Sequence, residues 1–251
     1  MSAIAGDNSA DRPPSRWRTA LWLSLYLLAV VLLTLLTQIG GLVLVGATVI
    51  VLALRTPRRH RWLATTALFV ALYAVASLTL VPAMATASGR VALPCARAPE
   101  ASVSALSFLT CALNRHYATP TVASLLETMA NDLERSLPNT RVRYLDAGFP
   151  FGWGMPMLLH LSHGDARKVD LAFFYKTFDG LYVPGLAPSP IGYWGFEQPR
   201  PSDSQPCVDT DGVSLRWDMA WLQPLWPDLA LDEQRNAAML NWLTGPGREH
   251  G

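Results

Sequence analysis

The stretch Thr19–Leu54, TALWLSLYLLAVVLLTLLTQIGGLVLVGATVIVLAL, decides the fold of the N-terminal part, because none of its 36 residues is charged. Roughly 20 helical residues cross the hydrocarbon core of a bilayer once, so this stretch is too long for a single span. The residues Thr37–Gly41 combine a Gln with paired Gly, which is typical of a tight turn. We therefore expect two membrane helices, near 19–37 and 40–54. The second is short, so a tilted or re-entrant segment stays open as an alternative.

A third apolar run, Trp62–Ala85, predicts another span near 62–83. A cleaved signal peptide has one short apolar region, so three long runs do not fit one. The sequence thus predicts a transmembrane region over 19–85. The membrane itself is the first expected partner.

Basic residues flank these runs unevenly, and this asymmetry predicts the orientation. Arginines precede the first run and separate the second from the third, whereas the turn between the first two carries none; they are Arg12, Arg16, Arg18, Arg55, Arg58, Arg59 and Arg61. Loops rich in Lys and Arg stay in the cytoplasm. We expect residues 1–18 to form a cytoplasmic tail of a multi-pass inner-membrane protein, and residues 86–251 to form an extracytoplasmic, periplasmic domain.

Composition supports two different parts. Hydrophobic residues make up 51% and charged residues 16%, against about 25% charged in soluble domains. Residues 1–83 contain seven Arg and two Asp, whereas residues 84–251 contain thirteen basic and seventeen acidic residues. The net charge of +1 does not suit a nucleic-acid binder, so nucleic acid is not an expected partner.

The outer part combines helix and strand patterns. Thr121–Leu137 has apolar residues at helical spacing between two prolines, and Asp232–Leu243 is a second helix with an acidic N-cap. Arg141–Leu145 alternates like a strand, and Val169–Tyr175 has the composition of a buried strand. The expected class is an α+β extracytoplasmic domain after three N-terminal transmembrane helices.

All three cysteines lie in this outer part. An oxidising compartment permits disulfides, and the short spacing favours Cys95–Cys111 as the pair. Cys207 then remains, as a free thiol, a link to another chain, or a residue whose partner is missing.

The segment His160–Asp170, HLSHGDARKVD, is the strongest candidate for a functional site, because it combines two histidines with acidic residues. Zinc sites in enzymes use imidazole and carboxylate ligands and keep one position open, which turns water into a nucleophile near neutral pH. His163 before the predicted strand and Asp170 on it can converge on one ion. The alternative is a hydrogen-bonded His–carboxylate pair without metal. His116 is interpreted as a polar loop or cap residue.

This segment resembles the zinc motif of the hedgehog/DD-peptidase fold, and especially of penicillin-insensitive murein endopeptidases, in the pattern His-x-x-His-(six residues)-Asp. The segments 145–151 and 189–193 resemble those of uncharacterised bacterial membrane proteins with such a domain, and the resemblance covers roughly residues 140–245. It implies that His163 and Asp170 are zinc ligands and that His160 is a nearby active-site histidine.

Two features depart from the family pattern. Ala166 stands where the family often has Gly, and the family's C-terminal His-x-His, which supplies the third ligand, is absent, since only His250 follows His163. We expect either a truncated product of a longer gene or a domain that has lost the chemistry. The resemblance thus implies a membrane-anchored, murein-endopeptidase-like zinc domain acting on or near peptidoglycan, inactive or weakened in this chain. The alternative function is a non-catalytic outer domain that binds cell wall or a protein partner.

Overall fold

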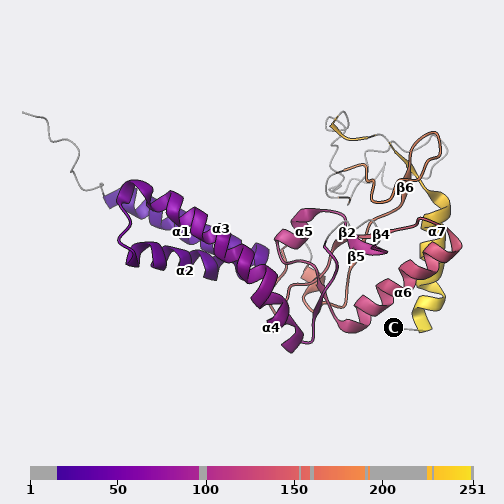
Figure 1. Ribbon diagram of the computed structural model, residues 1–251, viewed down its shortest axis with the longest axis horizontal. Helices are drawn as coiled ribbons and strands as arrows, with labels where there is room; N and C mark the ends of the chain where they lie inside the picture. The colour runs from indigo at the N-terminus through magenta and orange to yellow at the C-terminus, as the bar shows by residue number, and fades with distance from the viewer. Residues whose placement is uncertain are drawn as a thin grey trace, which may run out of the picture. The chain divides into compact units, whose positions relative to one another are not determined.

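The chain divides into two units, Met1–Tyr73 and Ala74–Gly251, which are described separately (Figure 1). The computed structural model describes residues 16–95, 101–152, 154–158, 161–189, 192, 225–227 and 229–249. The first of these units is helical, and the second combines helices with short strands.

In the first unit, α1 (Arg16–Thr37) turns directly into α2 (Gly40–Ala53). The turn needs glycine, because a Cβ on Gly41 would lie 1.9 Å from Thr34 Oγ1 and 2.4 Å from the Val30 carbonyl oxygen. The hydroxyl of Tyr26 on α1 donates to Thr48 Oγ1 on α2 at 3.0 Å. The two apolar helices therefore pack closely, and the tight turn predicted from the paired glycines is confirmed.

Two helices are long and apolar enough to cross a membrane: α1, with 22 residues, and the continuous helix Arg58–Ala87, with 30. The second consists of η2 (Arg58–His60), α3 (Arg61–Val75), the π-helical η3 (Ala76–Leu80) and α4 (Val81–Ala87), so it continues past the predicted end at residue 83. The helix α2 has 14 residues and rises about 21 Å, less than the hydrocarbon thickness. The expectation of three spans therefore stays a prediction.

The described residues of the second unit form three small sheets. The strand β2 (Val103–Ala105) pairs in parallel with β4 (Val142–Asp146), which pairs antiparallel with β5 (Asp170–Leu171). The two other sheets are antiparallel pairs, β1 (Val91–Ala92) with β3 (Tyr117–Ala118), and β6 (Tyr175–Lys176) with β7 (Ala230–Leu231). Mixed pairing of short strands beside helices makes this an α+β unit.

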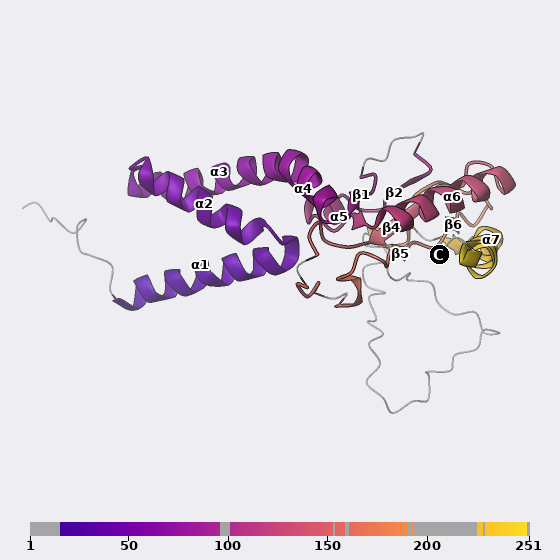
Figure 2. The same cartoon turned by 90° about the horizontal axis from the view of Figure 1, so that it is seen from below.

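In the described part of this unit, the strands are accompanied by the helices α5 (Phe108–Ala112), α6 (Pro120–Ser136) and α7 (Glu233–Thr244). Figure 2 shows α6 and α7 at the end of the unit away from α4. Their apolar faces share one core with the strands, formed by Val103, Met129, Leu133, Val142, Tyr144, Phe174, Met239 and Trp242 among others. The indole N–H of Trp242 donates to Asp132 Oδ2 at 2.9 Å, which ties α7 to α6.

The two predicted helices of this unit are confirmed to within one residue, and Asp232 caps α7 by accepting from the backbone N–H of Arg235. The single strand predicted over Val169–Tyr175 is wrong, because the chain forms β5 and β6 in different sheets. Asn236 explains the break, since its carboxamide bonds both the N–H and the C=O of Phe174 (3.0 and 2.8 Å) between the two strands.

Candidate metal centre

His163 lies at the end of a 3-10 turn, η4 (Leu161–His163), and its side chain is buried. Its Nδ1 lies 3.1 Å from the carbonyl oxygen of Ala147, and its Nε2 lies 3.1 Å from Asp170 Oδ1. The side chains of His163 and Asp170 thus meet, as a shared site requires. Asp170 keeps 28% of its side chain exposed, which opens the pair to solvent on one side.

A second carboxylate, Asp146, completes a group of three. Asp146 at the end of β4 pairs in register with Asp170 at the start of β5, and one ligand atom from each of Asp146, His163 and Asp170 lies within 4.8 Å of the others. Two carboxylates opposite each other across strands repel, so this arrangement needs compensating positive charge.

Arg115 supplies part of that charge. Its Nε donates to Asp146 Oδ1 at 2.9 Å, its second terminal nitrogen bonds Asp146 Oδ2, and both side chains are less than a tenth exposed. The backbone N–H of Ala147 also donates to Asp146 Oδ1, at 3.1 Å. Asp146 is thus a fixed, neutralised carboxylate, and Asp170 contacts His163.

His163 is electrostatically matched to this position. The hydrogen bond to Asp170 raises the pKa of His163 above its ordinary value, and although burial lowers it, the charges of Asp170 and Asp146 and the Ala147 carbonyl add to the upward shift. Both ring nitrogens face oxygen atoms, so the imidazolium form donates from both. In that form the Nε2 proton lies between the imidazole and Asp170, on the nitrogen that a metal ion would need.

Arg90 holds the two loops that shape the site. Its terminal nitrogens donate to the carbonyl oxygens of Phe149, at 2.5 Å, and Gly164, at 2.7 Å. Burial lowers the pKa of Arg90, and the charge of Asp165 acts in the opposite direction. Because Gly164 follows His163 directly, Arg90 fixes the backbone on which His163 sits.

Ala166 closes the same loop in a left-handed conformation, with φ of +57°. Its N–H donates to the His163 carbonyl oxygen at 3.1 Å, and its own carbonyl accepts from Thr119 at 3.0 Å. A left-handed backbone favours Gly, so Ala166 holds a conformation that is unfavourable for alanine. A Cβ on neighbouring Gly148 would lie 2.8 Å from that of Ala166, so only glycine fits at Gly148.

Sequence reasoning identified His163 and Asp170 but missed Asp146, Arg115 and Arg90. The signal for Asp146 was its position directly after the predicted strand 141–145. His160, Cys207 and His250 lie outside the residues that the structure describes. The roles of His163 and Asp170 as metal ligands stay predictions.

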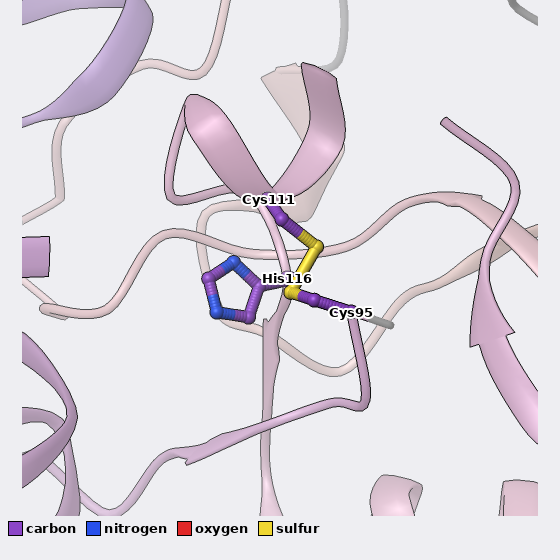
Figure 3. Close-up of side chains that lie close together, drawn as sticks. All are labelled: Cys95, Cys111 and His116. Atoms are coloured by element: carbon purple, nitrogen blue, oxygen red, sulfur yellow. A yellow bond between two sulfur atoms is a disulfide. The ribbon is translucent and has the colours of Figure 1, made fainter. Parts of the chain in front are cut away.

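A second group of metal-ligating residue types, Cys95, Cys111 and His116, lies elsewhere in the unit (Figure 3). The predicted disulfide Cys95–Cys111 is confirmed, so in this state the two sulfurs are bonded to each other. His116 lies in the loop between α5 and β3, as interpreted, but its side chain is buried, with 8% exposed. Burial lowers the pKa of His116 to about 4, so it is neutral.

No protein-family model matches the chain, and no curated protein or solved structure shows significant similarity to it.

Proposed function

We propose that this chain is a membrane-anchored protein whose outer unit binds zinc through His163 and Asp170, with the carboxylate of Asp146 as the third ligand beside them, as a murein-endopeptidase-like domain. The observation that carries the proposal is the orientation of His163. Its Nδ1–H is bonded to the Ala147 carbonyl, which leaves Nε2 directed at Asp170 Oδ1, 3.1 Å away. Ligating histidines in metal sites have this arrangement, with one nitrogen fixed by a carbonyl and the other on the ion.

A zinc ion at such a site supplies Lewis acidity for the hydrolysis of an amide. In this chain the protein groups orient it: Ala147 fixes the tautomer of His163, and Arg115 holds Asp146. Because Arg115 already engages both oxygens of Asp146, that carboxylate is a weak third ligand. We therefore expect low zinc affinity and weak hydrolysis.

The proposed substrate class is the peptide part of peptidoglycan, and it rests on the resemblance of the His160–Asp170 segment. The placement of the unit outside the inner membrane rests on three proposed spans and on the arginines that flank them. The disulfide Cys95–Cys111 supports this placement, because disulfides persist in oxidising compartments.

Zinc content tests the proposal. The full chain is purified in detergent at pH 7.5 and dialysed to equilibrium against zinc, and the bound metal is measured by mass spectrometry against the dialysis buffer. We expect one zinc per chain, lost in His163→Ala and in Asp170→Asn but retained in His60→Ala, a matched change of an exposed histidine in η2. Release of soluble peptides from purified peptidoglycan, abolished in His163→Ala, tests the activity.

A chain that takes up no zinc, or that keeps it in His163→Ala, would contradict the proposal. A second candidate would then hold, a non-catalytic outer domain that binds cell wall or a partner protein. The pairing within the site favours it, since Arg115 forms an ion pair with Asp146 and His163 contacts Asp170 without any metal. In that case Asp170→Asn lowers the thermal stability of the metal-free protein, and zinc has no effect.

A further inference from the structure

The helix α5 carries two large apolar side chains into solvent. Phe108 is 81% exposed and Leu109 is 58% exposed, and no charged residue occurs from 101 to 114. Phe108 also forms part of the wall of an open cavity of about 630 Å³, together with Leu186 and Trp226. Apolar surface of this kind, gathered in one place, marks an interaction site rather than ordinary surface variation.

The helix α5 is held so that these two residues stay outside. The hydroxyl of Thr110 donates to the Leu145 carbonyl oxygen at 2.7 Å, and Cys111 is covalently bonded to Cys95. Ser107 caps the helix by accepting from the N–H of Leu109. The exposure is therefore a property of the fixed helix.

A hydrogen bond ties the end of this segment to the long helix Arg58–Ala87. The carboxamide of Asn114, which is fully buried, donates to Ser77 Oγ on η3 at 3.1 Å. Both views place α5 next to α4, the continuation of that helix (Figures 1 and 2).

The length of the long helix gives the depth of this contact. Starting at Arg61, the last arginine before the apolar run, 20 residues reach Leu80 and rise about 30 Å, the thickness of the hydrocarbon core. Beyond that point Val81 and Ala85 are buried in the outer unit, so α4 belongs to that unit. Ser77 then lies about one turn inside the border, which brings α5 to the level where acyl chains meet headgroups.

We propose that α5 is a membrane-interface helix, with Phe108 and Leu109 inserted into the outer surface of the same bilayer that the long helix crosses. The inference rests on the membrane placement in the proposed function. The partner is lipid of any headgroup, because the segment has no charge with which to select one. The insertion holds the outer unit on the bilayer, with β4 one hydrogen bond from α5 through Thr110 and Leu145.

Photolabelling of the native chain tests this without a thiol probe. The protein is reconstituted in phosphatidylcholine nanodiscs that contain a phospholipid with a diazirine near the start of one acyl chain, irradiated, digested and mapped by mass spectrometry. We expect adducts on residues 61–80 and on Phe108 and Leu109. Phe178 and Leu181, which are 77% and 61% exposed in the turn after β6, are the matched internal control and should stay unlabelled.

The outcomes separate the two claims. Adducts on 61–80 without adducts on Phe108 or Leu109 overturn the interface helix, leave the span standing, and assign the apolar surface to a protein partner. Absence of adducts on 61–80 overturns the membrane placement and the interface helix together. Equal labelling of Phe178 and Phe108 also overturns the inference, since exposure alone would then explain the adducts. The double variant Phe108→Ser and Leu109→Ser should lose adducts in 101–114 only.

Discussion

Among its described residues, the second unit contains two groups of metal-ligating residue types that are similar in composition and differ in chemistry. In one, His163 lies between Asp170 and the Ala147 carbonyl, with Asp146 nearby. In the other, His116 lies beside the disulfide Cys95–Cys111, and among the described residues its Nδ1 has no hydrogen-bond partner. The pKa of His163 is raised by its carboxylate, and that of His116 is lowered to about 4 by burial.

The difference shows that the distance between ligand atoms alone does not make a metal site. A metal site needs ligand atoms with available electron pairs and surrounding charges that stabilise a cation. The His163 group has two carboxylates and a fixed tautomer, whereas the sulfurs of the His116 group are bonded to each other. The first group is therefore held together by charge and the second by a covalent bond, and the predictions below test that contrast.

The largest expected effect comes from Arg115→Met, which leaves Asp146 buried without a counter-charge. Removing one partner of a buried ion pair costs about 3–5 kcal/mol, so the free energy of unfolding should fall by that amount. Denaturant unfolding of the second unit, followed by near-UV circular dichroism, measures it.

Arg141→Met is the matched control, since its partner Glu134 is partly exposed and such pairs contribute about 1 kcal/mol or less. Adding Asp146→Asn to Arg115→Met should restore part of the loss. A loss in Arg115→Met no larger than in Arg141→Met would show that charge does not hold the His163 group.

The second prediction concerns the covalent group. Cys95 and Cys111 are 16 residues apart, and replacing both by Ala opens the loop that their disulfide closes. A disulfide that closes a loop of that size stabilises a fold by about 3 kcal/mol. Unfolding measured in a Cys207→Ser background should show this loss. Reductant should then destabilise the protein that keeps the disulfide and leave the double Ala variant unchanged.

The third prediction is a pH dependence carried by His116. Because its pKa falls from 6.5 in the unfolded chain to about 4 in the folded one, the unfolded state binds a proton first as the pH falls. Stability should drop between pH 6.5 and 4 by about 3 kcal/mol from this residue, and no further below.

The variant His116→Phe keeps a ring beside Tyr117, whose centroid lies 4.4 Å away, and should lose this slope. His163 has the opposite sign: its raised pKa gives stability that is present below pH 6.5 and is lost as the pH rises through the folded pKa. The difference between wild type and His116→Phe at each pH isolates the His116 contribution. Parallel pH curves would contradict its assignment as a buried neutral group.

Local patterns predicted what local forces decide. The helix α6 follows from its apolar spacing and Pro120, and α7 follows from its Asp232 cap, because these signals act within a few residues. The break between β5 and β6 was not predictable, since it depends on Asn236, 62 residues from Phe174. A local pattern contains no information about so distant a partner.

The candidate site divides in the same way. His163 and Asp170 lie seven positions apart, so spacing alone suggested that they meet. Asp146 joins them through strand register, and Arg115 reaches Asp146 across 31 positions. The position of Asp146 after a predicted strand is a weak signal, and no local pattern indicates Arg115. Only the pairing of β4 with β5 brings the two carboxylates opposite each other.

The smallest expected effect lies at Ala166, where the two groups meet. Its N–H bonds the His163 carbonyl, and its carbonyl bonds Thr119, three residues after His116. In Ala166→Gly, relief of the left-handed backbone gains about 1–2 kcal/mol. The greater conformational freedom of Gly in the unfolded chain lowers the free energy of unfolding by about 0.5–1 kcal/mol, and loss of the buried methyl group lowers it by about 0.8 kcal/mol. These terms nearly cancel, so the free energy of unfolding should change by less than about 1 kcal/mol.

Gly148→Ala gives the contrast at this junction, because its Cβ would lie 2.9 Å from the Tyr117 carbonyl oxygen as well as 2.8 Å from the Ala166 Cβ. Removing the Ala166 methyl relieves only one of these contacts, so the double variant should recover part of the loss, measured by the same unfolding experiment. Full recovery would show that the side chain of Ala166 alone sets the spacing between the two groups. No recovery would place the whole constraint in the backbone bridge between Tyr117 and Gly148, and the left-handed residue would then be incidental to the geometry around His163.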